Sequence, residues 1–473
     1  MNQRPLCVDL DGTLIRTDIL HESILQLIKH HFLLLFLVPL WLFKGKSHMK
    51  SRIAENTDIQ YATLPYRPEI LELIGDAKRA GRHIVLATAS MHEHAEGVAK
   101  HLGLFDSIEA SDEKTNLGGA NKARRLVERF GEKGFDYAGN GTTDLAVWRC
   151  SHSAIVVAHG ESLARKARSA CHEVVHIRVD RITAKKFLKS IRIHQWLKNV
   201  LVFLPLLAAH KTNDLQALGN VLLAFLSFGL GASAVYVLND LLDLDSDRQH
   251  KSKHKRPFAS GAIGTSDGFM IIFGLLACSA LVALQLPAEF GAVLAMYFVL
   301  TSLYSFWLKR QVMVDITMLA TLYTVRLVAG AAAAHVSPSF WLLAFSMFFF
   351  LGLGTVKRYT ELRDISHTAN SRPAGRGYSV HDLPLILNMG ICSSMISTLV
   401  FALYIHSPET MITYRSNEYL WPAAGALLYW NARVWMKAHR EEIHEDPVVF
   451  ATLDKQSWAI MLIIMACFFA ANI

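Results

Sequence analysis

The sequence VYVLNDLLDLDSDRQHKSKHKRPFASG, at residues 235–261, decides how the membrane-like half of this chain is interpreted. An apolar helix runs directly into several carboxylates, which five basic residues follow. At 100° per residue, Asp240, Asp243 and Asp247 lie within about 60° of one another on a helix. Such a stripe is costly near a membrane unless it binds cations, and Mg²⁺ binds through carboxylates together with a substrate phosphate. We therefore expect a Mg²⁺ site here.

Two neighbours of this stripe are interpreted differently. Asn239 lies beside Asp243 on the same helix face, whereas Asp245 points roughly the other way and is interpreted as a bystander. The alternative interpretation is a solvated helix end whose acids pair with the lysines that follow. That alternative does not explain three acids on one face next to an asparagine.

The two halves of the 473-residue chain differ in composition. The chain is 52% hydrophobic and yet 19% charged, and the apolar runs gather after residue 196. The length of these runs, several of them near the about 20 residues that cross a bilayer, predicts an all-α polytopic membrane domain. Its nine expected transmembrane helices are 196–209, 215–238, 266–286, 288–307, 313–334, 339–356, 383–406, 418–435 and 456–472.

Basic residues concentrate on one set of the loops between these helices. The positive-inside rule makes that set cytoplasmic, and nine spans then leave the N-terminus in the cytoplasm of an inner-membrane protein. The net charge of +8 is explained by this topology, and we expect no nucleic-acid partner. The residues counted are Arg248, Lys251, Lys253, Lys255, Arg256, Lys309, Arg310, Lys357, Arg358, Arg363, Arg372, Arg376, Arg433, Lys437, Arg440 and Lys455.

Further polar clusters lie at the same side of the membrane domain. RIHQWLKN opens its first span, KRYTEL closes its sixth, and EDPVVFATLDK lies in its last cytoplasmic loop. Together they predict a cytoplasm-facing, metal-lined pocket that receives a phosphorylated group beside lipid. A structural Lys357–Glu361 pair and a snorkelling Lys198 are the alternatives. The candidates are Arg192, Gln195, Lys198, Asn199, Lys357, Arg358 and Glu361, with Asp446 and Asp454 as weaker ones.

These motifs resemble the UbiA prenyltransferase superfamily over about residues 185–473. NDLLDLDSD fits its N-D-x-x-D-x-x-x-D motif, whereas KRYTEL stands where aromatic prenyltransferases generally carry a second aspartate-rich motif. That variant, with RIHQWLKNVLVF and DPVVFA, looks like the decaprenyl-phosphate phosphoribosyltransferase branch. The resemblance implies transfer of 5-phosphoribosyl from phosphoribosyl diphosphate to a polyprenyl phosphate. Mg²⁺ on the three aspartates would neutralise the leaving diphosphate, while Lys357 and Arg358 would hold phosphate and Asn239 and Arg256 would join the substrate site.

The first half predicts a doubly wound α/β domain, in which strands deliver polar residues at their carboxyl ends. LCVDLDGTLIRTD places Asp9 and Asp11 on the same side of the chain. Asp9 is the expected nucleophile and Asp11 the general acid and base of phosphoryl transfer. The other candidates are Thr88 and Lys122 for the phosphoryl oxygens, and Asp9, Asp11, Asn140 and Asp144 for Mg²⁺.

Four segments carry these residues: LCVDLDGTLIRTD, GRHIVLATAS, GANKARRL and FDYAGNGTTDLAVW. In this order they resemble the haloacid dehalogenase (HAD) phosphatase superfamily over about residues 4–160. One departure is that Asn140 stands where the family usually has an acid, which should weaken metal binding. We expect a Rossmann-like HAD domain at 1–165, a basic linker at 166–190 and the membrane domain at 191–473.

The insertion after Asp11 forms an expected cap at about residues 17–70. Its apolar stretch 32–43 is too short to span a bilayer, and Lys29, Lys44 and Lys46 flank it. We expect an interfacial or re-entrant element that contacts the membrane, with a buried cap core as the alternative.

The two halves together predict a bifunctional enzyme. A phosphoribosyl transfer product keeps its ribose 5-phosphate, which a phosphatase on the same membrane face could remove. The alternatives are an aromatic prenyltransferase that uses polyprenyl diphosphate, and a membrane-anchored phosphatase whose membrane domain is a carrier or passive anchor. No pattern in the sequence fixes the lipid length or the oligomeric state.

Overall fold

The structure is a computed structural model that describes residues 4–250, 252–366, 376–443 and 446–472. The chain divides into two compact units. The first joins Met1–Ile191 to Tyr236–Phe273, and the second joins Arg192–Val235 to Gly274–Ile473. Lys251 and Arg372, two of the basic residues counted for the topology, lie outside the described residues.

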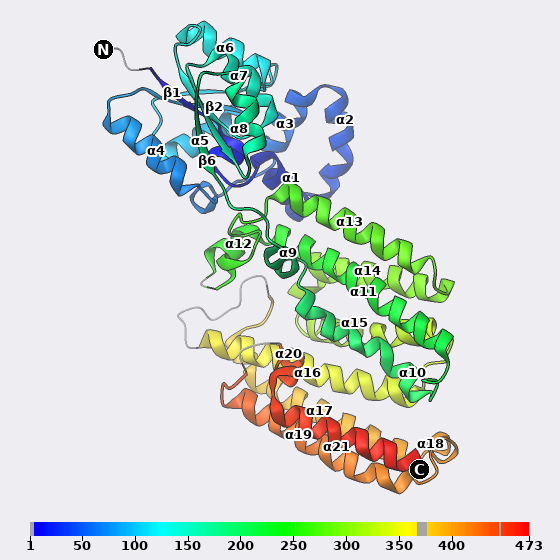
Figure 1. Cartoon of the computed structure of the whole chain (residues 1–473). Helices are drawn as coiled ribbons and strands as arrows, with labels where there is room; N and C mark the ends of the chain where they lie inside the picture. The colour runs from blue at the N-terminus through cyan, green and yellow to red at the C-terminus, as the bar shows by residue number, and fades with distance from the viewer. Residues whose placement is uncertain (1–3, 251, 367–375, 444–445, 473) are drawn as a thin grey trace. The chain divides into compact units, whose positions relative to one another are not determined.

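A parallel sheet forms the centre of the first unit (Figure 1). It has six strands in the order β3-β2-β1-β4-β5-β6. This order reverses between β1 and β4, where a doubly wound sheet places its ligand site. The predicted α/β fold is therefore confirmed. The strands are β1 (Leu6–Val8), β2 (Ile84–Met91), β3 (Ser107–Ser111), β4 (Asp136–Gly139), β5 (Ser153–Ala158) and β6 (Glu173–Arg178).

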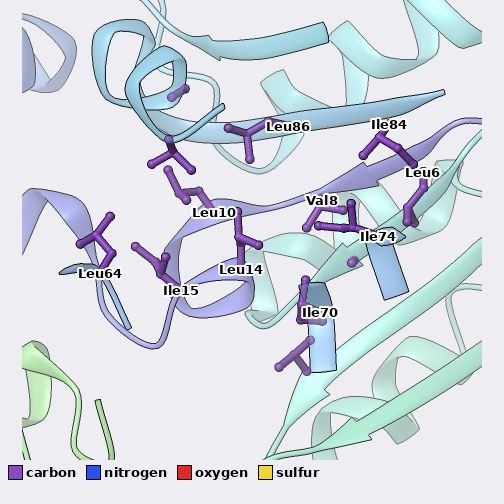
Figure 2. Close-up of a cluster of buried hydrophobic side chains, with 14 of the residues drawn as sticks. Leu6, Val8, Leu10, Leu14, Ile15, Leu64, Ile70, Ile74, Ile84 and Leu86 are labelled. Carbon is purple, nitrogen blue, oxygen red and sulfur yellow. The ribbon is translucent and has the colours of Figure 1, made fainter. Parts of the chain in front are cut away.

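Each face of the sheet carries its own apolar core, because side chains alternate along a strand. Leu6 and Val8 of β1 pack on one face with Ile70 and Ile74, as Figure 2 shows, and Cys7 packs on the other with Trp148. The helices of this domain outside the insertion are α4 (Pro68–Arg79), α5 (His92–Leu102), α6 (Ala120–Phe130), α7 (Leu145–Cys150), α8 (Glu161–Arg168) and α9 (Ala184–Ser190).

The sheet continues past residue 165, where the sequence predicted the domain to end. β6 pairs with β5 over six residues, so part of the expected linker 166–190 is an edge strand. The alternation in EVVHIR, with half-buried valine and isoleucine, is the local reason for this strand.

The insertion between β1 and β2 is helical and has a small core made by Leu27, Met49 and Ile53. By contrast, the segment from Phe32 to Phe43 exposes most of its large apolar side chains, and Phe43 is 89% exposed. The helical elements of the insertion are α1 (Ile19–His30), the 3₁₀ helix Phe32–Leu37, α2 (Val38–Phe43), α3 (Lys46–Glu55) and the 3₁₀ turn Tyr61–Thr63.

The described residues beyond the sheet domain are mostly helical, as predicted. Among the described residues, seven helices are long and apolar enough to cross a membrane. They are α11 (Leu215–Leu242), α13 (Thr265–Ala283), α14 (Ala288–Phe306), α15 (Val314–Ala333), α16 (Phe340–Ser366), the segment Val380–Ile405 that contains α17 (Leu383–Ile405), and α21 (Lys455–Asn472). The shorter helices are a 3₁₀ stretch (Ile193–Phe203), α10 (Leu204–Ala208), α12 (Leu244–Gln249), α18 (Pro408–Thr413), α19 (Trp421–His439) and α20 (Pro447–Leu453).

The predicted number of nine spans is not confirmed. The first expected span is a short 3₁₀ stretch that continues into α10 with Pro205 at its start, and together they run only from Ile193 to Ala208. The eighth corresponds to α19, which carries Arg433 and Lys437 in its last two turns and is not among the seven.

Candidate functional site

The first polar cluster lies where β1, β2 and β4 end. Asp9 directly follows β1, and its backbone N–H donates to the carbonyl of Ala138 in β4. The Lys122 ammonium, at the start of α6, lies 2.7 Å from Asp9 Oδ1 and 2.8 Å from the Tyr137 hydroxyl. That hydroxyl donates to Asp144 Oδ1 at 3.0 Å. The predicted nucleophile, lysine and distal acid are thus joined in one buried chain.

The electrostatics of this cluster match its expected chemistry. Burial, with the charge of Asp144, raises the pKa of Asp9 to about 6, although Lys122 opposes the rise. Burial, with the charges of Asp18 and Asp9, raises the pKa of Asp11 to about 7. A carboxyl group that titrates near neutrality can both give and take a proton, as a general acid and base must.

The loop around Gly12 holds the acids in place. Asp11 accepts hydrogen bonds from the Ile19 N–H at 2.8 Å and from the Ser90 hydroxyl at 2.6 Å. Gly12 has a φ of +71°, and a Cβ there would lie 2.1 Å from Nδ2 of Asn140. Only glycine satisfies both conditions, because the left-handed conformation disfavours a side chain and the carboxamide fills the space.

The residues predicted to hold Mg²⁺ are placed around this loop. Asp144 Oδ2 accepts from the N–H groups of Asn140 and Gly141, and Asn140 Oδ1 accepts from the Thr13 hydroxyl at 3.3 Å. Among the described residues, no three His, Cys, Asp or Glu side chains lie together as metal ligands. Two carboxylates, Asp9 and Asp144, with one amide oxygen nevertheless form a donor set of hard oxygens, which fits Mg²⁺.

The Asp-rich segment, residues 239–247, runs from the last turn of α11 into α12 and belongs to the first unit. The helix is interrupted at Asp243 (φ −100°, ψ 13°), which precedes α12, so the continuous helix that the sequence predicted is wrong at this residue. The backbone oxygen of Asn239 still accepts from the Asp243 N–H at 3.0 Å.

Asp240 and Asp247 remain together, since one guanidinium nitrogen bridges them. Arg256 Nη1 lies 3.1 Å from Asp240 Oδ1 and 2.5 Å from Asp247 Oδ2. Both carboxylates are buried, and burial raises the pKa of Asp247 although Arg256 opposes the rise. Because a single cationic atom contacts both, the two side chains form a place for a cation, and their oxygen donors fit Mg²⁺.

The other two acids of this segment contact α1. The Lys29 ammonium lies 3.7 Å from Asp243 Oδ1, and the Gln26 side chain donates to Asp245 at 3.1 Å. Asp245, which the sequence suggested was a bystander, therefore has a partner from a distant part of the chain.

In the second unit, two predicted lysines share one carboxylate. Lys198 and Lys357 donate to Asp446 Oδ2 at 2.7 and 3.0 Å. Burial acts to raise the pKa of Asp446, but the two ammonium groups more than offset it and hold the pKa below its ordinary value. The buried Asn199 accepts a hydrogen bond from Arg326 at 2.9 Å. Arg192 precedes the 3₁₀ stretch with a φ of 51°.

Arg358 and Glu361 lie in a separate ion network. The Arg358 side chain is fully buried, pairs with Glu361 and lies 2.7 Å from Asp315, which Arg376 also contacts at 2.7 Å. The structure thus places Lys357 and Arg358, neighbours in sequence, in two different ion networks. Asp454 is likewise held by a bidentate Arg433, which lowers its pKa to about 2.

Both parts of the chain match known protein families. The UbiA prenyltransferase family matches residues 200–471, more than half of the chain. The chain belongs to the UbiA prenyltransferase family. The haloacid dehalogenase-like hydrolase family matches residues 6–149, so this UbiA-family protein carries an N-terminal HAD-like domain. Both resemblances seen in the sequence are confirmed, and the protein is an integral membrane enzyme with a hydrolase-type domain.

Relatives of this UbiA-family enzyme differ in how much of it they match. It is 37% identical over 470 residues to the uncharacterized protein y4nM of Sinorhizobium fredii, covering 99% of this chain and 91% of that protein. It is 35% identical over 178 residues to the decaprenyl-phosphate phosphoribosyltransferase of Mycobacterium tuberculosis, covering 37% of this chain and 59% of that protein. A solved UbiA homolog from Archaeoglobus fulgidus, bound to DMAPP and Mg²⁺, gives a TM-score of 0.47 at 14% identity and covers 60% of this chain and 98% of that one.

Sequence reasoning missed three residues of the HAD-like site. Ser90 stands two residues after Thr88 on β2, so a period of two could have found it. Tyr137 lies on β4, three residues before Asn140, and that spacing did not indicate it. The Ser90 N–H donates to the buried Thr88 hydroxyl oxygen at 3.0 Å. Lys50 of α3 donates to the Ala89 carbonyl at 2.7 Å, and no local signal indicated it.

Proposed function

We propose that this UbiA-family enzyme transfers the 5-phosphoribosyl group of phosphoribosyl diphosphate to a polyprenyl phosphate. We also propose that its HAD-like domain then removes the 5-phosphate of the lipid-linked product. The likeness to decaprenyl-phosphate phosphoribosyltransferases supports the first step, although the chain spans 59% of the M. tuberculosis protein. The observation that carries the choice of a phosphorylated acceptor is the pair of ammonium groups, Lys198 and Lys357, that converge on Asp446.

The transfer step needs charge neutralisation more than it needs a base. An oxygen of the lipid phosphate forms a bond to ribose C1 while the bond from C1 to the diphosphate oxygen breaks, and the diphosphate leaves with the electron pair. Mg²⁺ bound at Asp240 and Asp247 would neutralise the leaving group's charge. Arg256, which bridges these carboxylates here, is a donor for the same diphosphate once the carboxylates hold a cation.

The remaining residues of the proposed transferase set have supporting roles. Lys198 and Lys357 hold the lipid phosphate as point charges, and Asp446 keeps both ammonium groups oriented. Arg358 and Glu361 are left out, because their mutual pairing and the burial of Arg358 favour a structural role. The set proposed to bind substrate or metal is Arg192, Lys198, Asn199, Asn239, Asp240, Asp243, Asp247, Arg256 and Lys357.

The phosphatase step uses the chain from Asp9 to Asp144. Asp9 attacks phosphorus, the bond from phosphorus to O5′ breaks, and Asp11 gives the leaving oxygen its proton. Asp11 then takes a proton from the water that hydrolyses the aspartyl phosphate. Lys122, 2.7 Å from Asp9, neutralises the phosphoryl oxygens, and Thr88 is the proposed hydroxyl donor. Mg²⁺ on Asp9, Asp144 and Asn140 would add positive charge at the phosphoryl group.

The membrane placement is also a proposal. Seven apolar helices support an integral membrane enzyme, and the basic loops favour a cytoplasmic HAD-like domain. The exposed apolar side chains at 32–43, with Lys44 and Lys46 beside them, support contact of this insertion with the bilayer surface. Fusing a reporter that is active only in the periplasm to the N-terminus would test the orientation, and a positive signal would contradict it.

Product analysis tests the proposed reaction. Purified full-length protein is incubated with phosphoribosyl diphosphate and a polyprenyl phosphate, and the lipid products are identified by mass spectrometry. We expect lipid-phosphoribose from Asp9→Asn and its dephosphorylated form from the wild type. Phosphate release that is unchanged in Asp9→Asn would refute the phosphatase role. Parallel reactions with polyprenyl diphosphate and an aromatic acceptor test the prenyltransferase alternative, and loss of all transfer in intact Asp240→Ala excludes a passive membrane domain.

A further inference from the structure

Helix α1 of the HAD-like domain contacts the phosphatase site at its first residue. The N–H of Ile19 donates to Asp11 Oδ1 at 2.8 Å, and the Asp18 side chain caps the helix by accepting from the His21 N–H. This end of α1 is therefore part of the HAD-like site already described.

The next turns of α1 contact the Asp-rich segment. Arg248 donates twice to Glu22, from Nη1 at 2.9 Å and from Nη2 at 2.7 Å. Both side chains are at most 5% exposed. Glutamate is almost never buried to this degree unless it is paired, and this bidentate geometry is the strong form of the pair. Arg248 directly follows Asp247, so Glu22 holds a cation that is adjacent in sequence to the proposed metal site.

Three contacts form one continuous face. Glu22, Gln26 and Lys29 are spaced at i, i+4 and i+7, which places them on one side of the helix. Their partners follow in reverse sequence order along the Asp-rich segment: Arg248, Asp245 and Asp243. Apolar side chains complete the face, since Leu25 lines one small pocket together with Leu241, Leu242 and Leu244.

The two charged contacts act in opposite directions on a cation at the Asp-rich segment. Without Glu22, the Arg248 guanidinium would be an unpaired cation one residue from Asp247, where it would compete with Mg²⁺. Lys29 lies 3.7 Å from Asp243, so its positive charge already opposes a second cation there. Glu22 therefore favours metal binding and Lys29 limits it.

We propose that α1 of the HAD-like domain sets the cation affinity of the transferase's Asp-rich segment, with Glu22 and Lys29 as positioning residues. This inference rests on the proposed role of Asp240 and Asp247 in binding Mg²⁺. It assigns to the phosphatase domain a part in the transfer reaction, because the metal affinity of one domain depends on a helix of the other.

Direct metal binding tests the proposal without relying on turnover. Full-length protein in the Asp9→Asn background, which weakens the HAD-like metal site, is titrated with Mn²⁺, and free Mn²⁺ is followed by electron paramagnetic resonance. We expect Glu22→Gln to weaken Mn²⁺ binding about three- to tenfold, and Lys29→Gln to strengthen it about two- to fivefold. Each substitution removes one unit charge, whose interaction with the bound cation is partly screened by solvent and salt. The half-saturating Mg²⁺ concentration of transfer should move the same way.

Controls separate charge from general loosening. Glu109→Gln removes the same charge from an acid of β3 that pairs with Arg125 and Arg129 of α6, and we expect no change in Mn²⁺ affinity. Adding Arg248→Gln to Glu22→Gln should restore the parent affinity, because the competing cation is removed. If Glu22→Gln acted by loosening the packing of α1, adding Arg248→Gln would instead weaken Mn²⁺ binding further.

The outcomes distinguish this inference from the proposed function. If Asp240→Ala removes none of the Mn²⁺ binding of the parent protein, the metal assignment itself fails. If such binding exists but Glu22→Gln and Lys29→Gln leave it unchanged, or shift it in the same direction, the role of α1 is refuted. Lys29 is partly exposed, so its variant provides the answer even if Glu22→Gln does not fold.

Discussion

Replacing the HAD-like nucleophile should stabilise the protein at neutral pH while it abolishes dephosphorylation. Asp9 is 8% exposed, and its pKa is raised from an ordinary value of 3.8 to about 6 even with Lys122 at 2.7 Å. A carboxyl group with a raised pKa binds its proton more tightly in the folded state than in the unfolded chain. The free energy of unfolding therefore falls as pH rises from about 4 to above 6.

The size of the effect follows from the pKa. At 1.36 kcal/mol per pKa unit, keeping Asp9 ionised costs about 3 kcal/mol above pH 6. Asp9→Asn resembles the protonated carboxyl group, so the variant avoids this cost. We expect it to raise the free energy of unfolding of the α/β unit by up to about 3 kcal/mol at pH 8 and by almost nothing at pH 4. Catalytic groups often carry such a cost, because activity needs a destabilised charge.

Urea-dependent proteolysis of the full-length protein in detergent would measure this difference. Cleavage within residues 4–190 reports opening of the α/β unit, and the midpoint is compared between variant and wild type at pH 4 and pH 8. Asp112→Asn is the matched control, since Asp112 is exposed and hydrogen bonds from Thr115 and Lys114 lower its pKa. That control should gain no stability at pH 8. Equal midpoints for Asp9→Asn and wild type at pH 8 would show that burial does not penalise this charge.

Three further changes have distinct expected outcomes. Gly12→Ala should abolish phosphatase activity and destabilise the α/β unit by more than about 1 kcal/mol, because the residue has positive φ and its Cβ would overlap a carboxamide; activity and urea midpoints check this. Lys357→Met should raise the KM for polyprenyl phosphate about tenfold, because one charged hydrogen bond is lost. The effects of Lys357→Met and Lys198→Met on KM should not be additive, because both lysines contact Asp446; steady-state kinetics measure both. A nitroxide on Phe43→Cys should collide more with oxygen than with a water-soluble relaxant in nanodiscs, and the reverse ratio would place 32–43 in water.

The HAD-like site was predictable because its residues follow strands. Asp9 and Asp144 come after β1 and β4, and Thr88 lies in the second half of β2, so the parallel strands bring the three residues to one edge of the sheet. The sequence pattern therefore indicated both the fold and the neighbours. Tyr137 and Lys50 were not found, since nothing local shows that a strand tyrosine will bridge two charges or that a cap lysine will reach Ala89.

The Asp-rich segment was predictable only in part. Helical spacing correctly grouped Asp240 with Asp247, but it could not show the interruption at Asp243. The roles of Arg256 and Glu22 depend on contacts between segments distant in sequence or across a turn, which periodicity does not contain. The count of nine spans is not confirmed where a proline and several polar residues shorten or interrupt apolar runs, as in the stretch that ends at Ala208.

The first unit is discontinuous, and this has a consequence during synthesis. Residues 1–191 leave the ribosome well before 236–273, and α11 must be delivered to the membrane in between. Until Arg248 emerges, the carboxylate of Glu22 has to remain hydrated, so α1 cannot reach its final packing. Folding of the nascent HAD-like domain is therefore completed only after residues 236–273 are synthesised, when membrane insertion has already begun.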